Sequence, residues 1–159
     1  MEVAIIESPL GKLVLKALDN KLVELTYCKS ITKLQRPSSL FLKQVIQELQ
    51  AYFQGKLTTF KLPIHLSGTS FQLKVWQALA NIPYGKTLSY SELAKQLKTG
   101  PRAIGNACRT NPIPIIIPCH RILAKNGLGG YSGQTIGKFI KVKQWLLAHE
   151  QTYSPARHR

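Results

Sequence analysis

The sequence predicts an α+β protein of two domains, in which a small β-sheet domain precedes a mainly helical one. The first third of the 159 residues consists of short β-rich runs separated by turn residues. The remainder places apolar residues at helical spacing and has Ser or Thr where helices would begin. The segment Leu66-Ser67-Gly68-Thr69 separates the two patterns. We therefore expect domains over residues 1–66 and 70–152, followed by a basic tail over 153–159.

Three short strands are predicted first, over Val3–Ile6, Lys12–Leu18 and Leu22–Tyr27. Each run is β-rich or alternates apolar with polar side chains, as a strand with one buried face does. Gly11 separates the first two runs and Asp19-Asn20 separates the last two, so tight turns are expected at both places.

One helix is expected to complete the first domain. Ser38 or Ser39 is its predicted cap, because a serine side chain accepts hydrogen bonds from the free N–H groups of a first turn. Gly55 is its predicted end. The apolar positions at helical spacing are Leu42, Val45, Ile46, Leu49 and Phe53. A short extended piece from Thr59 to Ile64 is expected after this helix.

The second domain is predicted to begin with a helix capped by Thr69 or Ser70. The apolar face of this helix consists of Phe71, Val75, Trp76, Leu79 and Ile82. A turn at Pro83-Tyr84-Gly85 separates it from the next predicted helix.

Two short helices come next. Ser89 and Glu92 have the spacing of a capping box at the start of a helix through Leu97. Pro101 suits the first turn of a second helix that reaches about Arg109. A tight glycine-containing turn joins them, so the pair predicts a helix-turn-helix.

The last third of the domain is less regular. Asn111-Pro112-Ile113-Pro114 ends the second short helix, and a strand-like run is expected to lead to Cys119. A glycine-rich hairpin region is expected over Lys125–Gly133, and a final helix carries Trp145-Leu146-Leu147.

The charge of the chain is strongly positive. Its 22 Lys and Arg residues face seven acids, and residues 93–159 contain 11 of the basic residues but the single acid Glu150. Such a field favours a polyanionic partner, above all nucleic acid. A solvated basic surface or attraction to anionic lipid would leave the same composition.

Two classes of protein are disfavoured. The apolar run Ile113–Ile117 is interrupted and flanked by prolines and is far too short for a membrane span. The first residues contain two acids and do not resemble a secretion signal.

Three cysteines without a Cys-x-x-Cys pair indicate a reducing, cytoplasmic setting, and the spacing of Cys and His is not that of a zinc site. We expect no metal and no membrane.

The second short helix has unusually small side chains, because Ala103, Gly105 and Ala107 alternate along it. A thin helix can approach either a neighbouring helix or the narrow minor groove of DNA. If the helix enters the minor groove, Arg102 at the start of the helix is placed to push into the base stack. If the helix packs against another helix, Arg102 is an ordinary solvated arginine.

Pro118-Cys119-His120-Arg121 is the candidate nucleophile motif. A thiol beside a histidine and a cation can be held as a thiolate, which is the nucleophilic form. Glu150 is a candidate to orient His120 in a Cys-His-Glu relay. Neighbours in a strand point to opposite faces, so contact requires a bend or a bridging water. The alternative is a buried structural cysteine.

Taken together, these segments closely resemble the O6-alkylguanine-DNA alkyltransferases, the methylated-DNA–protein-cysteine methyltransferase family. The resemblance is dense from about Ser70 to Glu150 and looser before it. The matching segments are Ser8-Pro9-Leu10-Gly11, the run from Phe71 to Tyr90 with Ile82-Pro83-Tyr84-Gly85-Lys86-Thr87, Asn111-Pro112, Pro118-Cys119-His120-Arg121, Tyr131-Ser132-Gly133 and Trp145-Leu146-Leu147-Ala148-His149-Glu150.

The resemblance implies a ribonuclease-H-like first domain and a winged-helix second domain that binds double-stranded DNA from the minor groove as a monomer. It implies irreversible transfer of an alkyl group from O6 of guanine, and also from O4 of thymine, to Cys119 in a flipped-out base. No cofactor is needed. His120 and Glu150 would generate the thiolate through water.

Further residue roles are implied by the same resemblance. Tyr90 would give the leaving guanine a proton, Asn111 would link the recognition helix to the active-site turn, and Arg102 would fill the gap left by the base. The remaining expected DNA or base contacts are Ala103, Gly105, Cys108, Arg109, Pro114, Tyr131, Ser132 and Gly133.

Two departures from the family pattern stand out. The segment between Gly133 and Trp145 is a few residues longer. Two interpretations are open, an extra turn of the last helix or a larger lid, and the size of alkyl group accepted is left undetermined. The zinc-bearing members need ligands in the first domain, where this chain has only Cys28 and His65, so no zinc is expected. A non-catalytic DNA-binding module and a thiol hydrolase using Cys119 are the competing hypotheses.

Overall fold

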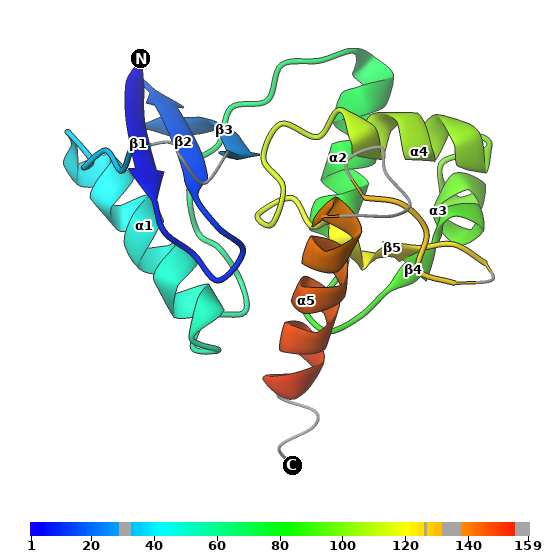
Figure 1. The fold of residues 1–159 in the computed structure, drawn as a ribbon. Coiled ribbons are helices and arrows are strands. Elements are labelled where there is room, and N and C mark those ends of the chain that lie inside the picture. The colour runs from blue at the N-terminus through cyan, green and yellow to red at the C-terminus, as the bar shows by residue number, and fades with distance from the viewer. Residues whose placement is uncertain (29–32, 126, 132–137, 155–159) are drawn as a thin grey trace. The chain divides into compact units, whose positions relative to one another are not determined.

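The computed structural model describes residues 1–28, 33–125, 127–131 and 138–154. The chain divides into two compact units, Met1–Leu66 and Ser67–Arg159 (Figure 1). Strands and one helix make the first unit, whereas helices dominate the second. The architecture is therefore α+β, as the sequence predicts.

The first unit is a three-stranded antiparallel sheet with one helix. Strands β1 (Glu2–Ile6), β2 (Leu13–Leu18) and β3 (Lys21–Tyr27) pair in the order β1-β2-β3. Asp19 and Asn20 have φ values of 52° and 58°, so both central residues of the β2–β3 turn are left-handed, as a tight hairpin of this hand requires. The three predicted strands are confirmed to within a residue.

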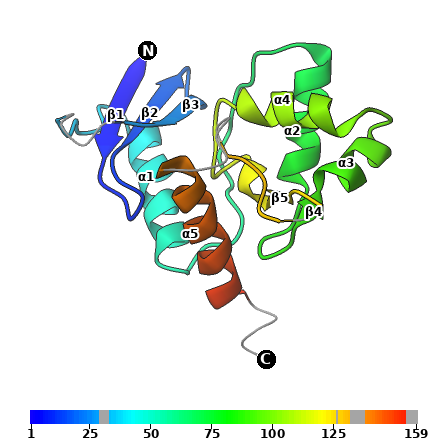
Figure 2. The ribbon, with the colours of Figure 1, turned by 45° about the vertical axis from the view of Figure 1, so that its right-hand side comes forward.

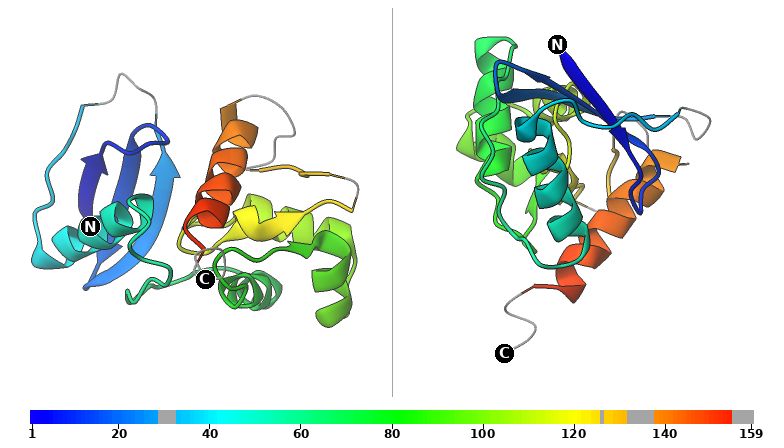
Figure 3. Two further views of the ribbon diagram at one scale, coloured as in Figure 1. Left: turned by 90° about the horizontal axis from the view of Figure 1, so that it is seen from below. Right: turned by 90° about the vertical axis from the view of Figure 1, so that its left-hand side faces the viewer.

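Helix α1 (Leu40–Phe53) lies along the sheet of its own unit (Figure 3). The Ser39 side chain caps it by accepting a hydrogen bond from the Leu42 N–H, which confirms the predicted start. Alternate residues of β2, namely Leu13, Leu15 and Ala17, are buried. The buried helix residues are Leu42, Val45, Leu49 and Tyr52.

The extended piece expected over Thr59–Ile64 is not a strand. The structure has only one isolated parallel bridge there, between Leu22 and Ile64. Leu22 donates its N–H to the Pro63 carbonyl and accepts from the His65 N–H. Pro63 has no N–H of its own, so it cannot extend the ladder.

The second unit begins with α2 (Ser70–Ala80), which carries a complete capping box between Thr69 and Gln72. Strand β4 (Leu88–Ser89) pairs in parallel with β5 (Ile122–Leu123). Helices α3 (Tyr90–Gln96) and α4 (Pro101–Arg109) lie together in this unit (Figure 2). The last helix of the chain is α5 (Lys138–Thr152).

The helix-turn-helix prediction is confirmed at its start but differs at its turn. Ser89 and Glu92 form the predicted capping box, and Pro101 occupies the first turn of α4. The left-handed residue of the turn is Lys98, with a φ of 56°, whereas Gly100 has the extended backbone of an N-cap. The glycine therefore begins the second helix instead of making the bend.

The prediction of a strand-like run before Cys119 is wrong. Residues 110–118 form a loop closed by the Ile117 N–H to Ile113 carbonyl hydrogen bond of 2.8 Å, and Cys119–Arg121 is a short 3-10 helix, η1. Three prolines remove the N–H groups that a strand would need. Ile115 is buried at a φ of 75°, a rare conformation for a β-branched residue.

The glycine-rich hairpin region expected over Lys125–Gly133 lies only partly within the described residues. An isolated bridge joins Ala124 and Gly127, while Asn126, Ser132 and Gly133 fall outside. In the described ranges of the chain, no helix has both the length and the apolar character needed to cross a membrane.

We predict that Gly68→Ala destabilises the second unit by about 1–3 kcal/mol. A Cβ at this position would lie 2.8 Å from two ring atoms of Trp76. That indole is buried and donates a hydrogen bond to the Ala107 carbonyl, so it cannot move freely. Urea unfolding measures the change. Gly127→Ala is the matched control, because a Cβ there meets nothing within 4 Å; equal effects for both variants would contradict the prediction.

Candidate active site

The candidate site is built around the carboxylate of Glu150 in the last turns of α5. His120 Nε2 lies 2.7 Å from Glu150 Oε2. Arg121 donates from Nε to Oε1 at 2.8 Å and from Nη2 to Oε2 at 2.9 Å, in the forked geometry that a guanidinium offers a carboxylate. All three side chains are buried. Two consecutive residues of η1 thus meet one acid 29 and 30 positions later.

The bend at η1 makes this meeting possible. Pro118 precedes the 3-10 helix, and the Cys119 N–H is bonded to the Ile117 carbonyl at 2.8 Å. In a strand, Cys119 and Arg121 would point to one face and His120 to the other. In a 3-10 helix, three successive side chains point in three directions about the axis. The chain therefore bends at the place where the sequence motif requires it.

Glu150 is an anion in the folded chain. Burial alone would raise its pKa, but hydrogen bonds from His120 and Arg121 and the charges behind them hold the pKa of Glu150 well below its usual range. The opposite applies to His120, because burial, together with the charges of Arg121 and Lys143, lowers the pKa of its ring more than Glu150 raises it. The histidine is therefore neutral at rest and donates Nε2–H to the carboxylate.

One nitrogen of the relay is left over. His120 Nδ1 is buried and has no hydrogen-bond partner in the part of the chain that the structure describes. With Nε2 carrying the proton, Nδ1 holds a lone pair and is a base. A buried lone pair without a partner costs free energy. Because the preceding residue, Cys119, carries a thiol, this nitrogen is available as a base for the thiol proton.

Cys119 is buried, with 7% of its surface exposed. Burial raises the pKa of its thiol to about 11, although the Asn111 side chain, the charge of Lys143 and a backbone N–H all act to lower it. The sequence motif predicts a thiolate held by neighbouring positive charge. The isolated chain instead holds a thiol, because desolvation outweighs that charge.

Asn111 connects α4 to the turn that carries the thiol. Its Nδ2 donates to the Ile117 carbonyl at 2.8 Å, and its Oδ1 accepts from the Ile113 N–H at 3.0 Å. Its side chain also bonds to Cys119. One amide therefore holds both ends of the loop between α4 and η1.

Tyr90, Cys108 and Cys119 come together although they lie on three different elements. Burial raises the pKa of Tyr90 to about 12, and the two cysteines contribute in the same direction. Burial likewise raises the pKa of Cys108 to about 12, with a further contribution from Cys119. All three groups are protonated at neutral pH, so the tyrosine is available as a proton donor.

The small residues of α4 do not share one face. Ala107 is buried against α2, whose Trp76 donates to its carbonyl at 2.9 Å, so close helix packing explains it. Ala103 and Gly105 are half-buried, and the atom nearest to a Cβ on Gly105 would be Tyr90 Cε1 at 4.0 Å. Arg102 and Arg109 are exposed.

Of the remaining predicted site residues, Pro114 is buried in the loop before η1 and Tyr131 is buried after the glycine-rich segment. Ser132 and Gly133 lie outside the described residues.

The sequence analysis did not predict the contacts that two charged side chains, Arg121 and Lys143, make in the site. Arg121 binds Glu150 and donates from Nη1 to the Ile82 carbonyl at 2.6 Å. Lys143 is fully buried and donates to the carbonyls of Ile122 and Gly130 at 2.6 and 2.9 Å. Helical spacing was the available signal, since Lys143, Leu146 and Glu150 share one face of α5.

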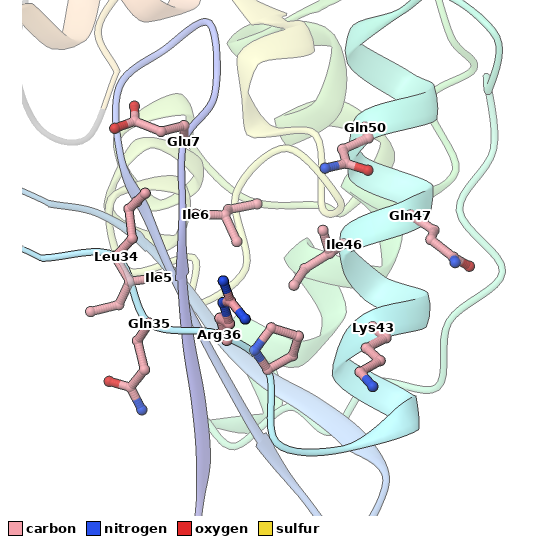
Figure 4. Close-up of a pocket in the computed structure, with 11 residues that line it drawn as sticks. Ile5, Ile6, Glu7, Leu34, Gln35, Arg36, Lys43, Ile46, Gln47 and Gln50 are labelled. Atoms are coloured by element: carbon pink, nitrogen blue, oxygen red, sulfur yellow. The ribbon is translucent and has the colours of Figure 1, made fainter.

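A separate groove lies in the first unit and has a volume of about 690 Å³ (Figure 4). Its lining includes Ile5, Leu34, Arg36 and Ile46, and none of the predicted site residues. Across the described ranges, no group of three or more His, Cys, Asp or Glu side chains could hold a metal ion.

Two family models match this chain. The model for the ribonuclease-like domain of 6-O-methylguanine DNA methyltransferase matches residues 1–66, and the model for its DNA binding domain matches residues 70–152. These matches confirm the family resemblance and the α+β class with a ribonuclease-like first domain.

Proteins called methylated-DNA–protein-cysteine methyltransferase are similar over nearly the whole chain. One from Saccharolobus solfataricus is 38% identical over 149 residues, covering 94% of this chain and 95% of that protein. One from Mycolicibacterium paratuberculosis is 40% identical over 164 residues, covering 98% and 96%.

Solved structures agree. The crystal structure of Mycobacterium tuberculosis O6-methylguanine methyltransferase has a TM-score of 0.84 at 37% identity, covering 97% of this chain and 94% of that one. The M. tuberculosis protein in complex with DNA has a TM-score of 0.82 at 38% identity, covering 97% and 95%.

Removing the charge of Glu150 is expected to destabilise the second unit. At pH 7, Glu150→Gln should lower the free energy of unfolding by about 3 kcal/mol, because it leaves Arg121 buried without its counter-charge. The pKa of Glu150 is depressed on folding, so the parent loses this stability as pH falls below about 4.5, the ordinary value. The difference between the proteins should therefore shrink toward pH 3.

Urea unfolding at pH 7 and pH 3 measures this difference. The matched control is Glu24→Gln, which removes a half-exposed ion pair with Lys16 and should change stability by less than about 0.5 kcal/mol. A difference for Glu150→Gln that stays constant over this pH range would show that the carboxylate charge is not responsible.

Proposed function

The chain belongs to the 6-O-methylguanine DNA methyltransferase family, and from that premise we propose that Cys119 is the residue that takes the alkyl group. The function is DNA repair by transfer of a methyl group from methylated DNA to a cysteine of the protein itself. The observation that supports Cys119 is its place beside His120, whose Nδ1 is a buried base without a partner in the described part of the chain. Cys28 lies in the other unit.

The proposed reaction is a single displacement at carbon. Removal of the thiol proton toward His120 Nδ1, through a bridging water, converts Cys119 to its thiolate. The sulfur then bonds to the alkyl carbon as the bond between that carbon and guanine O6 breaks, and the electron pair returns to the base. Glu150 stabilises the imidazolium that forms, because its carboxylate already accepts the Nε2 proton.

Tyr90 is proposed to give the departing base its proton. Its pKa of about 12 keeps the hydroxyl protonated until negative charge develops on the guanine ring. The proton taken up by His120 then returns to Tyr90 through water, so that over the whole reaction guanine gains one proton and the thiol exchanges its proton for the alkyl group. Asn111 holds the active-site turn in place relative to α4 during this step. Its hydrogen bonds to the backbone of Ile117 and Ile113 support this role.

The product at Cys119 is a thioether, which offers no good leaving group at sulfur. Each molecule would therefore act once, so the repair is stoichiometric. A high pKa in the resting state is consistent with such a protein, because a permanent thiolate would react with any small electrophile.

Damaged double-stranded DNA is the partner, and α4 is the proposed reading element. The exposed Arg102 at the first turn of α4 supports a role in filling the space of an extruded base. Ala103, Gly105, Arg109, Cys108, Pro114 and Tyr131 are the other proposed DNA or base contacts. The excess of basic residues after position 92 supports affinity for phosphates.

The protein is proposed to act as a monomer in the cytoplasm. One copy of the chain carries every group of this scheme, and three free cysteines suit a reducing compartment.

Cys119→Ala should abolish methyl transfer while leaving affinity for the DNA nearly unchanged, because it removes the acceptor atom only. The measurement is intact mass and peptide mapping after incubation with an oligonucleotide that contains one O6-methylguanine. The parent should gain one methylene on the Cys119 peptide and saturate at one per protein. Cys28→Ala is the matched control and should react like the parent.

Two results would contradict the assignment. Transfer that persists in Cys119→Ala would move the acceptor to another residue. Tight binding of the parent without any gain in mass would place the chain among lesion-binding proteins without transfer, and turnover of an ester or amide without DNA would favour a thiol hydrolase.

Arg102→Ala should slow transfer from duplex DNA by about tenfold or more, because the extruded base would then lose the side chain that replaces it in the stack. The effect should be much smaller with a single-stranded oligonucleotide, which has no gap to fill. Single-turnover rates on both substrates measure the difference. Lys95→Ala, an exposed cation on α3, is the matched control; equal losses for both variants would reduce Arg102 to a general phosphate contact.

A further inference from the structure

We propose that Lys143 is the positioning residue of this site: its buried ammonium supplies the positive charge that stabilises the Cys119 thiolate and holds the backbone on either side of the base pocket. The inference rests on the proposed function of Cys119 and deepens it.

The side chain of Lys143 is fully buried, which is rare for lysine. Its Nζ donates to the Ile122 carbonyl at 2.6 Å and to the Gly130 carbonyl at 2.9 Å. It also lies 5.9 Å from the centre of the Tyr90 ring, within the range of a cation–π interaction. Lys143 therefore joins the residue after the active-site turn to the residue before Tyr131.

Within the described ranges of the chain, the charge of Lys143 has no permanent partner of opposite sign. Among residues 1–28, 33–125, 127–131 and 138–154, no carboxylate forms an ion pair with it. Two carbonyl dipoles satisfy hydrogen bonds but do not neutralise a buried ammonium, which is costly without an anion. The site thus contains a cation that becomes well paired only when a neighbouring group ionises.

The groups that face Lys143 come from three elements packed around it. They are Cys119 and His120 of η1, Cys108 of α4 and Tyr90 of α3. Burial lowers the pKa of Lys143 to about 8, whereas ionisation of Cys119 or Cys108 raises it. Below about pH 8 the side chain is charged, and by reciprocity its charge lowers the pKa of Cys119.

Helix α5 delivers both charges that the reaction needs. Lys143 and Glu150 are seven residues apart, which is about two helical turns, so they share one face. Glu150 presents a negative charge to His120, and the positive charge of Lys143 lies close enough to the Cys119 thiol to lower its pKa. The base that removes the proton and the cation that stabilises the resulting anion are held by the same rigid element.

Three variants separate charge from hydrogen bonding. Lys143→Arg keeps the charge, Lys143→Gln keeps a donor without charge, and Lys143→Met keeps neither. The readout is the rate of Cys119 alkylation by iodoacetamide between about pH 5 and 10, followed by peptide mass. In this reaction the thiolate sulfur bonds to the reagent carbon and iodide leaves, so no DNA is required.

The Gln and Met variants should react about tenfold more slowly than the parent at pH 7, where Lys143 is charged, and this deficit should shrink as the pH rises above about 8, where the lysine of the parent loses its charge. The Arg variant should stay closer to the parent than either. A Gln variant slowed by the same factor at pH 7 and at pH 10 would overturn the proposal, because a purely structural lysine affects the rate at every pH alike.

A second measurement tests the same coupling with Lys143 left in place. The pH at which Lys143 loses its proton, followed by the NMR shift of its Cε, should be higher in Cys119→Asp than in Cys119→Ala, since a carboxylate at this position stands in for the thiolate that would retain the proton. Equal midpoints in the two variants would overturn the proposal. Parent protein that reacts with iodoacetamide but takes no methyl from O6-methylguanine DNA would instead refute the proposed function alone.

Discussion

One buried carboxylate holds the second unit together. Glu150 accepts hydrogen bonds from His120 and Arg121, and Arg121 also donates to the Ile82 carbonyl just after α2. The end of α2, the active-site turn and the final helix are thus joined at a single acid. Because each charge is buried, losing one partner leaves another uncompensated, so stability and chemistry share the same constraint.

The site combines two opposing electrostatic effects. Burial raises the pKa of the Cys119 thiol, while Asn111 and Lys143 act against it. The balance leaves a thiol at rest, next to a neutral His120 that can take its proton. A nucleophile that is formed only on demand suits a protein that is consumed by one reaction, because an unprotected thiolate would be lost to adventitious electrophiles.

Local patterns predicted most of the secondary structure. The serine and threonine caps, the Asp19-Asn20 turn and the first-turn proline of α4 each act through hydrogen bonds or φ values within a few residues, so they can be recognised in one dimension. The failure lies in a proline-rich segment. Residues 110–118 have strand-like side chains, but Pro112, Pro114 and Pro118 lack the backbone N–H groups that a ladder needs.

The sequence alone was enough to assign the family, the basic character of the second half and the candidate relay of Cys119, His120 and Glu150, because residue types and spacing along the chain carry that information. The folded arrangement was needed to show that Arg121 shares Glu150 with His120, that Lys143 is buried next to the thiol, and that Cys119 is protonated at rest. The physical reason is that burial and ion pairing depend on which distant segments meet. A pKa is set by that environment, which no local pattern specifies.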